Sequence, residues 1–328
     1  MFTTVNLVAE HTAGPIAEIL ASDRVLAVVD FQVEGPSNDN RADPRHVVTG
    51  LRPLVNAGTC EVWRCSDPVT WDWDGDLRWA CGEQVLFAAV SEIAPPDRDL
   101  DAVAYRAWLR LLQFSAGRGF PHMVRAWNHV PRINEGTGDY ERYRRFCTGR
   151  GRAFDALGYG CGHYPASSAV GNHGTTLVAY LLATAEPGHH HENPCQVSAY
   201  AYPRRYGPRP PSFARATAKV WGEATHVYVS GTASIVGHRS RCGGDIDGQL
   251  AVTFDNVNRL LHEIDGKAGS GTPDLLRVYV RDPANLDRVM AGVGRFAPHA
   301  SVIYVRADIC RRELALEIEG VRQRLTGS

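Results

Sequence analysis

Near the C-terminal end of the chain, a cysteine and a glutamate are spaced so that both could belong to one site. Cys310 and Glu317 lie in the stretch DICRRELALEIEG, residues 308–320. Polar and apolar residues alternate from residue 313 to residue 319, which is typical of a half-buried β-strand. One face carries Leu314, Leu316 and Ile318, and the other carries Glu313, Ala315, Glu317 and Glu319. The pattern alone favours glutamates on a solvent-exposed face, so chemistry at Glu317 depends on what lies against that face.

A second group of candidates lies in a proline-stiffened segment, residues 196–216, QVSAYAYPRRYGPRPPSFARA. Its polar side chains are Arg204, Arg205, Arg209, Arg215, Tyr202 and Tyr206. A rigid backbone that presents guanidinium groups suits the binding of a planar carboxylate, because each guanidinium is a bidentate fork. A surface loop with solvated arginines is the alternative, and the residues by themselves leave both open.

Two further stretches contain notable glycines. The segment ERYRRFCTGRGRAF, residues 141–154, holds Arg145 and Arg150, and basic residues on a helix usually form its solvated face. Gly149 and Gly151 each cost about 1 kcal/mol in a helix, which indicates close packing or an interruption. The segment VSGTASIVGHRSRCGGDIDGQ, residues 229–249, allows close approach around Gly231. It lacks a Walker lysine and the G-x-G-x-x-G spacing, so a phosphate site is not expected.

Other common site types find little support. The adjacent residues His189, His190 and His191 lack zinc-module spacing and more simply decorate a turn, so no metal is expected. There is no G-x-S-x-G motif of a serine hydrolase. The eight cysteines are scattered without a C-x-x-C pair, which predicts free thiols.

Composition narrows the class of protein. The 328 residues are 44% hydrophobic and 22% charged with a formal net charge of −1, which is normal for a globular protein and does not indicate a nucleic-acid partner. No apolar run approaches the roughly 18 residues of a membrane helix. The first residues show no signal peptide, so we expect a cytoplasmic protein without a membrane partner.

Strands and helices that must position the candidates can be predicted along the chain. Residues 59–90 mix alternating segments with Asp-Gly turns and predict antiparallel hairpins. A helix is expected over about 98–115, capped by Asp97 and ended by Gly117, and a second over about 139–157.

The last hundred residues give a regular order. Strands are expected at 225–230, 274–282, 301–307 and 313–320, and helices at 248–264 and 283–296. This β-α-β-α-β-β order predicts an α+β fold with two helices on one face of a sheet. The other face must then meet another domain, another subunit or water.

Six of these stretches together resemble the motifs of the chorismatase family. They are RAWNHVPRINE (125–135), ERYRRFCTGRGRAF, PASSAVG (165–171), ENPCQVSAYAYPRRYGPRPPSFARA (192–216), VSGTASIVGHRS (229–240) and DICRRELALEIEG. The resemblance runs from about residue 120 to the end. It implies a RidA/YjgF-like C-terminal half at residues 156–328, packed on a smaller mixed N-terminal domain at residues 1–155.

The resemblance also implies substrate and site residues. Family members remove pyruvate from chorismate, whose two carboxylates require cationic partners. It assigns this role to Arg209 and Arg215 with Tyr206 beside them, and less directly to Arg145 and Arg150. The family's catalytic acid is a glutamate on the last strand, a place that Glu317 occupies. No cofactor is implied, because the reaction involves neither net oxidation nor metal activation.

The product is implied by two further positions. The 3-hydroxybenzoate branch carries cysteine seven residues before the glutamate, as Cys310 does, and a second marker lies near Gly231. We therefore expect cleavage of chorismate to 3-hydroxybenzoate and pyruvate, which would supply an aromatic acid for secondary metabolism. Open alternatives are a 4-hydroxybenzoate product, hydrolysis to a dihydroxycyclohexadienoate, RidA-like imine hydrolysis and non-catalytic ligand binding. Both a monomer and a trimer are compatible with the sequence.

Overall fold

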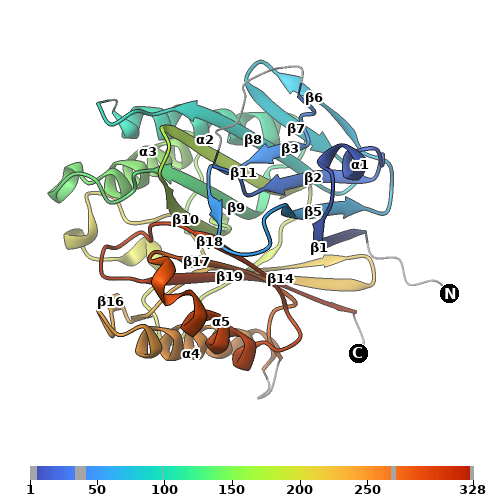
Figure 1. Ribbon diagram of the computed structural model, residues 1–328. Coiled ribbons are helices and arrows are strands. Elements are labelled where there is room, and N and C mark those ends of the chain that lie inside the picture. The colour runs from blue at the N-terminus through green and yellow to red at the C-terminus, as the bar shows by residue number, and fades with distance from the viewer. Residues whose placement is uncertain (1–5, 34–41, 98, 267–270, 326–328) are drawn as a thin grey trace.

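Two large β-sheets face each other, and helices cover their outer faces (Figure 1). The computed structural model describes residues 6–33, 42–97, 99–266 and 271–325. The six-stranded sheet has the order β10 (Ala166–Asn172), β9 (His122–Pro131), β11 (Thr176–Thr184), β8 (Leu86–Ile93), β7 (Leu77–Cys81) and β6 (Thr70–Asp74). The seven-stranded sheet has the order β12 (His189–His191), β13 (Ala216–Trp221), β14 (Ala224–Thr232), β19 (Leu316–Leu325), β17 (Leu275–Val280), β18 (Ser301–Arg306) and β4 (Arg52–Pro53).

A smaller sheet and short elements complete the described chain. The four-stranded sheet has the order β1 (Leu7–Ala13), β5 (Thr59–Cys65), β2 (Val25–Asp30) and β3 (His46–Val48), and α1 (Ile16–Leu20) packs on it. A hairpin joins β15 (Ile235–Val236) to β16 (Arg239–Ser240). Short 3-10 turns are η1 (Gly138–Tyr140), η2 (Cys161–His163), η3 (Ala199–Ala201), η4 (Arg204–Tyr206) and η5 (Pro283–Asn285).

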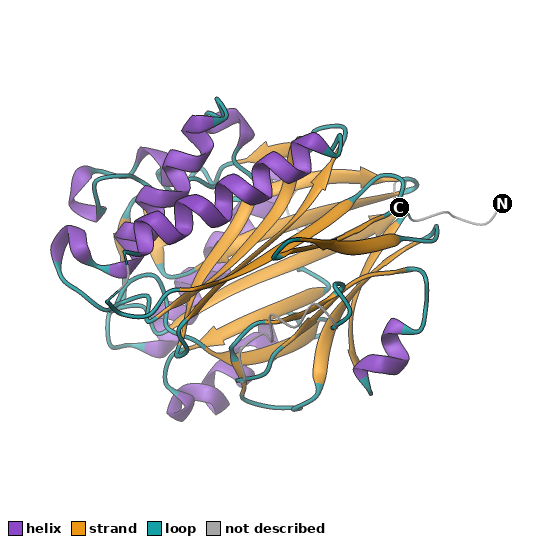
Figure 2. Cartoon of the chain, turned by 90° about the horizontal axis from the view of Figure 1, so that it is seen from above, coloured by secondary structure: helices purple, strands orange, loops and turns teal. Residues whose placement is uncertain are grey.

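Two pairs of helices cover the outer faces of the two large sheets (Figure 2). α2 (Leu100–Gly117) and α3 (Arg142–Ala156) pack against the six-stranded sheet, while α4 (Ile246–Asp265) and α5 (Leu286–Phe296) pack against the seven-stranded sheet. The close approach of α2 and α3 explains the helix glycine at residue 149. A Cβ on Gly149 would lie 2.1 Å from the carbonyl oxygen of Asp101.

The predicted β-α-β-α-β-β unit is confirmed as β14, α4, β17, α5, β18 and β19. The hairpins predicted for residues 59–90 are confirmed for β6, β7 and β8, whereas β5 belongs to the four-stranded sheet. All eight cysteines are free, as expected. Within the described residues, each helix is too short or too polar to span a bilayer.

Several predicted boundaries were wrong in detail. The side chain of Asp99, rather than Asp97, caps α2 by accepting from the Asp101 backbone N–H. The predicted helix over 283–296 opens as η5, and α5 starts only at Leu286. β19 starts at Leu316, so Leu314 precedes the strand and packs between the sheets.

The inner faces of the two large sheets form the main core. Trp127 and Tyr180 from one sheet pack in the same cluster as Tyr228 and Tyr279 from the other. The six-stranded sheet therefore covers the face of the seven-stranded sheet that the sequence left open. We still propose a domain boundary after residue 155. The strands β10 and β11 follow this position in the sequence and complete the six-stranded sheet.

Candidate active site

A cavity of about 270 Å³ opens between the two large sheets at the end where α3 and β10 lie. Six of the eight predicted site residues line it: Glu317, Cys310, Arg215, Tyr206, Arg150 and Gly231. They come from α3, the 202–215 segment, β14, β19 and the chain leading into β19. The topology thus brings together residues that are up to 167 positions apart in the sequence, as the numbers of Arg150 and Glu317 show.

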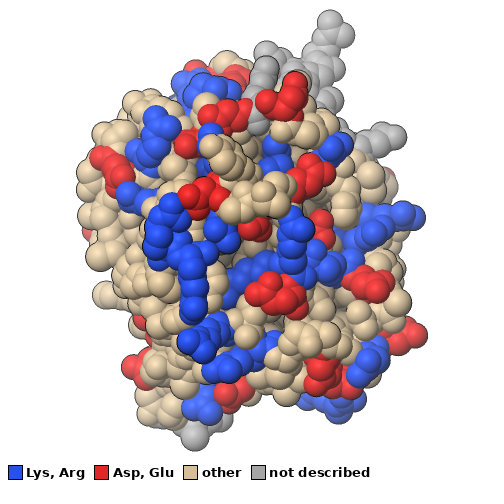
Figure 3. Space-filling model, turned by 90° about the vertical axis from the view of Figure 1, so that its left-hand side faces the viewer, with Lys and Arg blue, Asp and Glu red and all other residues tan. Residues whose placement is uncertain are grey.

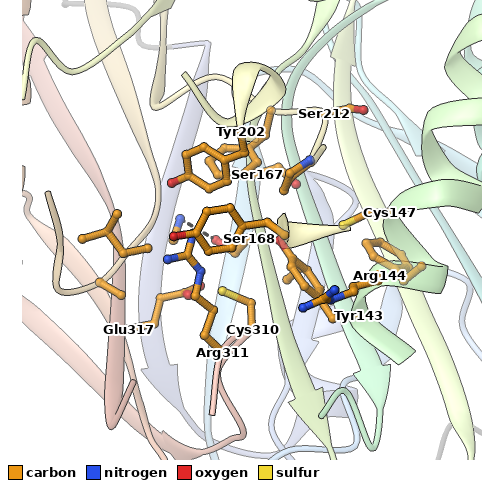
Figure 4. Close-up of a pocket in the computed structure, with 18 of the residues that line it drawn as sticks. Tyr143, Arg144, Cys147, Ser167, Ser168, Tyr202, Ser212, Cys310, Arg311 and Glu317 are labelled. Atoms are coloured by element: carbon orange, nitrogen blue, oxygen red, sulfur yellow. Dashed lines mark hydrogen bonds between the residues drawn. The ribbon is translucent and has the colours of Figure 1, made fainter. Parts of the chain in front are cut away.

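Glu317 is buried and faces this cavity (Figure 4). Strand alternation places Leu316 and Ile318 against α4 and α5, so Glu317 points to the opposite face, between the sheets. Burial, together with the nearby Glu319 carboxylate, raises the pKa of Glu317 from 4.5 to about 8, against the opposing effect of Arg125 and Arg215. Glu317 is therefore a neutral carboxylic acid at pH 7 that can donate a proton.

Behind Glu317 lies a network of buried charges. Glu319 forms ion pairs with Arg125 at 2.8 Å and with Arg277 at 3.3 Å, and its Oε1 accepts from the Trp127 indole at 2.8 Å. Arg277 in turn pairs with Glu61 of β5. Each of these side chains has an oppositely charged partner, whereas no ion pair is formed by Glu317 among the described residues.

Cys310 lies beside Glu317 at the cavity wall. Burial, and the Glu317 carboxyl group next to it, raise the pKa of the Cys310 thiol from 9.0 to about 12. At neutral pH Cys310 is therefore a neutral thiol and not a nucleophilic thiolate. It can shape the cavity or form weak hydrogen bonds.

Gly231 makes the closest approach to Glu317. A Cβ placed on Gly231 would lie 2.0 Å from Glu317 Oε1 and 3.1 Å from Ser168 Oγ. This position requires glycine because any larger residue would displace the carboxyl group. The small residues around Gly231 were predicted to allow close approach of a ligand or another backbone, and in the structure it is the Glu317 side chain that approaches.

Two buried arginines have donors to offer to a ligand. The Nη2 of Arg215 donates to the Val197 carbonyl oxygen and to the Tyr202 hydroxyl, both at 2.8 Å. Arg150 lies 4.2 Å above the Trp108 ring. Within the described residues, Nε of Arg215 and both Nε and Nη2 of Arg150 lack a hydrogen-bond partner. Guanidinium groups at the wall of a cavity suit the binding of an anionic ligand.

Arg209 and Arg145 are not brought to the cavity. Both Nη atoms of Arg209 donate to Asp155, at 2.8 and 2.7 Å, and its chain packs on Gly151, where a Cβ would lie 2.7 Å from Nε. This contact explains the glycine. Arg145 pairs with Asp99 at the N-terminus of α2. Both arginines are already neutralised by a carboxylate, so we do not include them in the site.

Sequence reasoning missed several lining residues. They are Ser167, Ser168, Tyr143, Cys147, Arg144, Arg311 and Arg312. Arg311 lies 4.1 Å above the Tyr206 ring and donates to the His238 carbonyl oxygen at 3.0 Å. Its position next to Cys310 in the quoted motif was an available signal. Ser167 and Ser168 had no such signal, because nothing in the sequence PASSAVG distinguishes a hydroxyl group that faces a cavity from one that is buried.

The end of the molecule that carries α3 and β16 is rich in basic side chains (Figure 3). Four arginines of the cavity wall belong to this end: Arg144, Arg205, Arg311 and Arg312. Acidic side chains lie among them, and Arg144 pairs with Glu141. A dianionic small molecule is the kind of ligand that such an entrance attracts.

The geometry agrees with comparisons to known proteins. A model of the N-terminal region of FkbO/Hyg5-like chorismatases matches residues 61–183. A protein of Streptomyces hygroscopicus named chorismatase is 35% identical over 271 residues, which cover 80% of this chain and 78% of that protein. A second protein of that organism, named 3-hydroxybenzoate synthase, is 34% identical over 271 residues, covering 78% of this chain and 76% of that protein.

A solved structure extends the similarity to the whole fold. The crystal structure of a chorismatase matches with a TM-score of 0.86 at 28% identity, and the match covers 98% of this chain and 100% of that chain. The region before residue 120, where the motifs are weakest, is therefore part of the same architecture.

Proposed function

Because the chain belongs to the chorismatase family, we propose that it cleaves chorismate to 3-hydroxybenzoate and pyruvate, with Glu317 as the catalytic acid. The single observation that carries this assignment is the buried Glu317 carboxyl group, whose pKa of about 8 keeps it protonated in an arginine-lined cavity. The identity to proteins named chorismatase and 3-hydroxybenzoate synthase supports it.

Two carboxylates must be neutralised when chorismate enters. Of the arginines that line the cavity, Arg150 and Arg215 are the buried ones, and we assign one carboxylate to each. Charge-assisted hydrogen bonds of this kind hold the substrate ring in one orientation. Holding the reacting groups in place lowers the barrier before any chemical step takes place.

The first step is proton transfer. The neutral carboxyl group of Glu317 donates its proton to the methylene carbon of the enolpyruvyl group, whose π electrons form the new C–H bond. The ether carbon becomes an oxocarbenium ion, and Glu317 becomes a carboxylate. The electron-poor ether oxygen is then a good leaving group from C3 of the ring.

The second step releases pyruvate. The C4 hydroxyl oxygen attacks C3 while the C3–O bond breaks, and its proton returns to the Glu317 carboxylate. The C3–O bond electrons stay on the departing oxygen, which gives the keto group of pyruvate and leaves a 3,4-epoxide on the ring. Opening of the C4–O bond, loss of the C3 proton and reprotonation at oxygen give 3-hydroxybenzoate. The atoms of chorismate equal those of the two products, so no water is consumed. Cys310 beside Glu317 would favour this internal displacement over attack by water.

The test is incubation of the purified protein with chorismate, with the products separated by chromatography and identified by mass. We expect 3-hydroxybenzoate and pyruvate in equal amounts, and loss of both in Glu317→Gln. Glu263→Gln, an exposed change on α4, is the matched control and should turn over normally. A dihydroxycyclohexadienoate product would be consistent with Glu317 as the catalytic acid, but it would contradict the assignment of 3-hydroxybenzoate as the product. Absence of pyruvate, or normal turnover by Glu317→Gln, would overturn the assignment.

A further inference from the structure

Ser168 lies where the two large sheets meet beside the cavity. It belongs to β10 of the six-stranded sheet, is 4% exposed, and lines the cavity opposite Gly231 of β14. Its backbone is fixed by the β9 pairing and by the Asn128 side chain, which donates to the Ser168 carbonyl oxygen at 2.8 Å. The position of the hydroxyl group is therefore set by a rigid sheet.

Both acceptor sites of the Ser168 hydroxyl oxygen are used. Arg125 Nη2 donates to Oγ at 2.7 Å, and the Gly231 backbone N–H donates to the same atom at 2.9 Å. A serine hydroxyl has two lone pairs and one proton. With two donors on the lone pairs, the proton must point away from both of them.

The Ser168 hydroxyl and the Glu317 carboxyl group both lie next to Gly231. The point at which a Cβ of Gly231 would lie is 3.1 Å from Ser168 Oγ and 2.0 Å from Glu317 Oε1, so both oxygens border the same small space. The charge of Arg125 polarises the hydroxyl group that it contacts, which makes Ser168 a better donor. The Glu317 carboxyl group is the acceptor that borders this space.

We propose that Ser168 is a positioning residue whose hydroxyl group donates a hydrogen bond to the carboxylate that Glu317 becomes when it protonates the substrate. The inference rests on the proposed function. The chain Arg125–Ser168–Glu317 then stabilises charge at the moment when it develops on Glu317. When the C4 hydroxyl returns the proton, the hydrogen bond relaxes and the acid is restored.

The charged and titratable groups around Glu317 define what a pH measurement reports. They are Glu319 on its own strand, Arg125 on β9, Arg215 before β13, Tyr143 on α3, and Cys310 with Arg311 before β19. Ser168→Ala changes none of these charges. A change in the titration of Glu317 in this variant therefore reports the lost hydroxyl donor.

The first test compares the pH dependence of pyruvate release. A donor to the carboxylate favours the charged form, so Ser168→Ala should move the alkaline fall of kcat/KM up by about one pH unit. It should also lower kcat about 10- to 100-fold. Ser168→Thr keeps the hydroxyl and should restore both values, while Ser115→Ala, which removes a buried hydroxyl from α2, should change neither. A lower kcat with an unmoved alkaline limb would mean that Ser168 only supports the local structure, and would overturn the inference.

A second test needs no turnover and so separates this inference from the proposed function. Carboxyl-¹³C glutamate labelling, with the Glu317 signal assigned by Glu317→Gln, gives the titration of that group directly. We expect the midpoint in Ser168→Ala above that of the wild type and of Ser168→Thr. Equal midpoints in all three proteins would overturn the role of Ser168, whether or not chorismate is the substrate.

Discussion

Glu317 and Glu319 lie two residues apart on the same buried face of β19, yet their surroundings differ. Glu319 is ion-paired with Arg125 and Arg277, whereas Glu317 faces the cavity with a pKa of about 8. After burial, the neighbouring Glu319 carboxylate is the second cause of the raised pKa of Glu317. A single strand thus carries both a carboxylic acid and the neighbouring carboxylate that raises the pKa of that acid.

The raised pKa of Glu317 predicts a pH-dependent cost in stability. An ordinary glutamate titrates near 4.5 and folded Glu317 near 8. Between these values the folded state keeps a proton that the unfolded state releases, so the wild type loses stability as the pH rises through this window. Glu317→Gln does not ionise, and its gain in Tm over the wild type should grow from pH 5 to pH 8, reaching about 2–5 °C, and then level off. Thermal unfolding across this range measures the difference, and a gain independent of pH would contradict the assigned titration.

Gly231→Ala should damage the site while the protein still folds. The added methyl would overlap Glu317 Oε1, so the carboxyl group must move away from its position in the cavity. We expect kcat to fall at least about 10-fold, since small misplacements of a catalytic group are costly. Gly294→Ala in α5 has open space around its Cβ and is the matched control. Unchanged kinetics in Gly231→Ala would show that the site tolerates the displacement.

Cys310→Ala should change the product more than the rate. A neutral thiol cannot replace Glu317 as the acid, so pyruvate release should stay within about threefold of the wild type. Loss of the thiol would admit water, and the share of dihydroxycyclohexadienoate should rise at the expense of 3-hydroxybenzoate. Product ratios by chromatography test this, with the exposed Cys161→Ala as control. An unchanged ratio would remove Cys310 from the choice of product.

Substitution by lysine should raise KM for arginines that line the cavity but not for an arginine outside it. Arg150→Lys and Arg215→Lys lose the guanidinium fork next to the substrate, and KM should rise at least about 30-fold. Arg209→Lys loses only a partly exposed pair with Asp155, so its KM should stay within about twofold. Steady-state kinetics at saturating and limiting chorismate separate the two groups. A comparable rise in all three variants would place Arg209 in the binding site after all.

Much of the fold could be predicted because its signals are local. The helical repeat of residues 248–264 and the alternation before Gly320 depend on neighbouring side chains, and they predicted α4 and the first half of β19. The cap of α2 was misassigned because Asp97 and Asp99 are both suitable capping residues, and the start of β19 was missed because strand pairing depends on partners elsewhere in the chain. Local pattern also could not show that β10 and β11 join the strands that precede α3.

The candidate site could be predicted in part for the same reason. Cys310 and Glu317 belong to one motif, and six of the eight predicted residues line the cavity. Arg209 and Arg145 could not be excluded, because their partners Asp155 and Asp99 lie 54 and 46 residues away. Ser168 could not be identified, because its role depends on Arg125 and Gly231, which belong to different sheets.

By itself, the sequence determined the α+β class, the order of the C-terminal elements and the resemblance to chorismatases, since each of these is encoded in short stretches of chain. Only the tertiary structure decided that the face of β19 that carries Glu317 and Glu319 is buried away from water. Read locally, that face is solvated, and it becomes buried because a second sheet from the first half of the chain packs against it. Removal of water from a carboxyl group is what raises its pKa, so the acid at Glu317 is a property of the packed sheets and not of the strand alone.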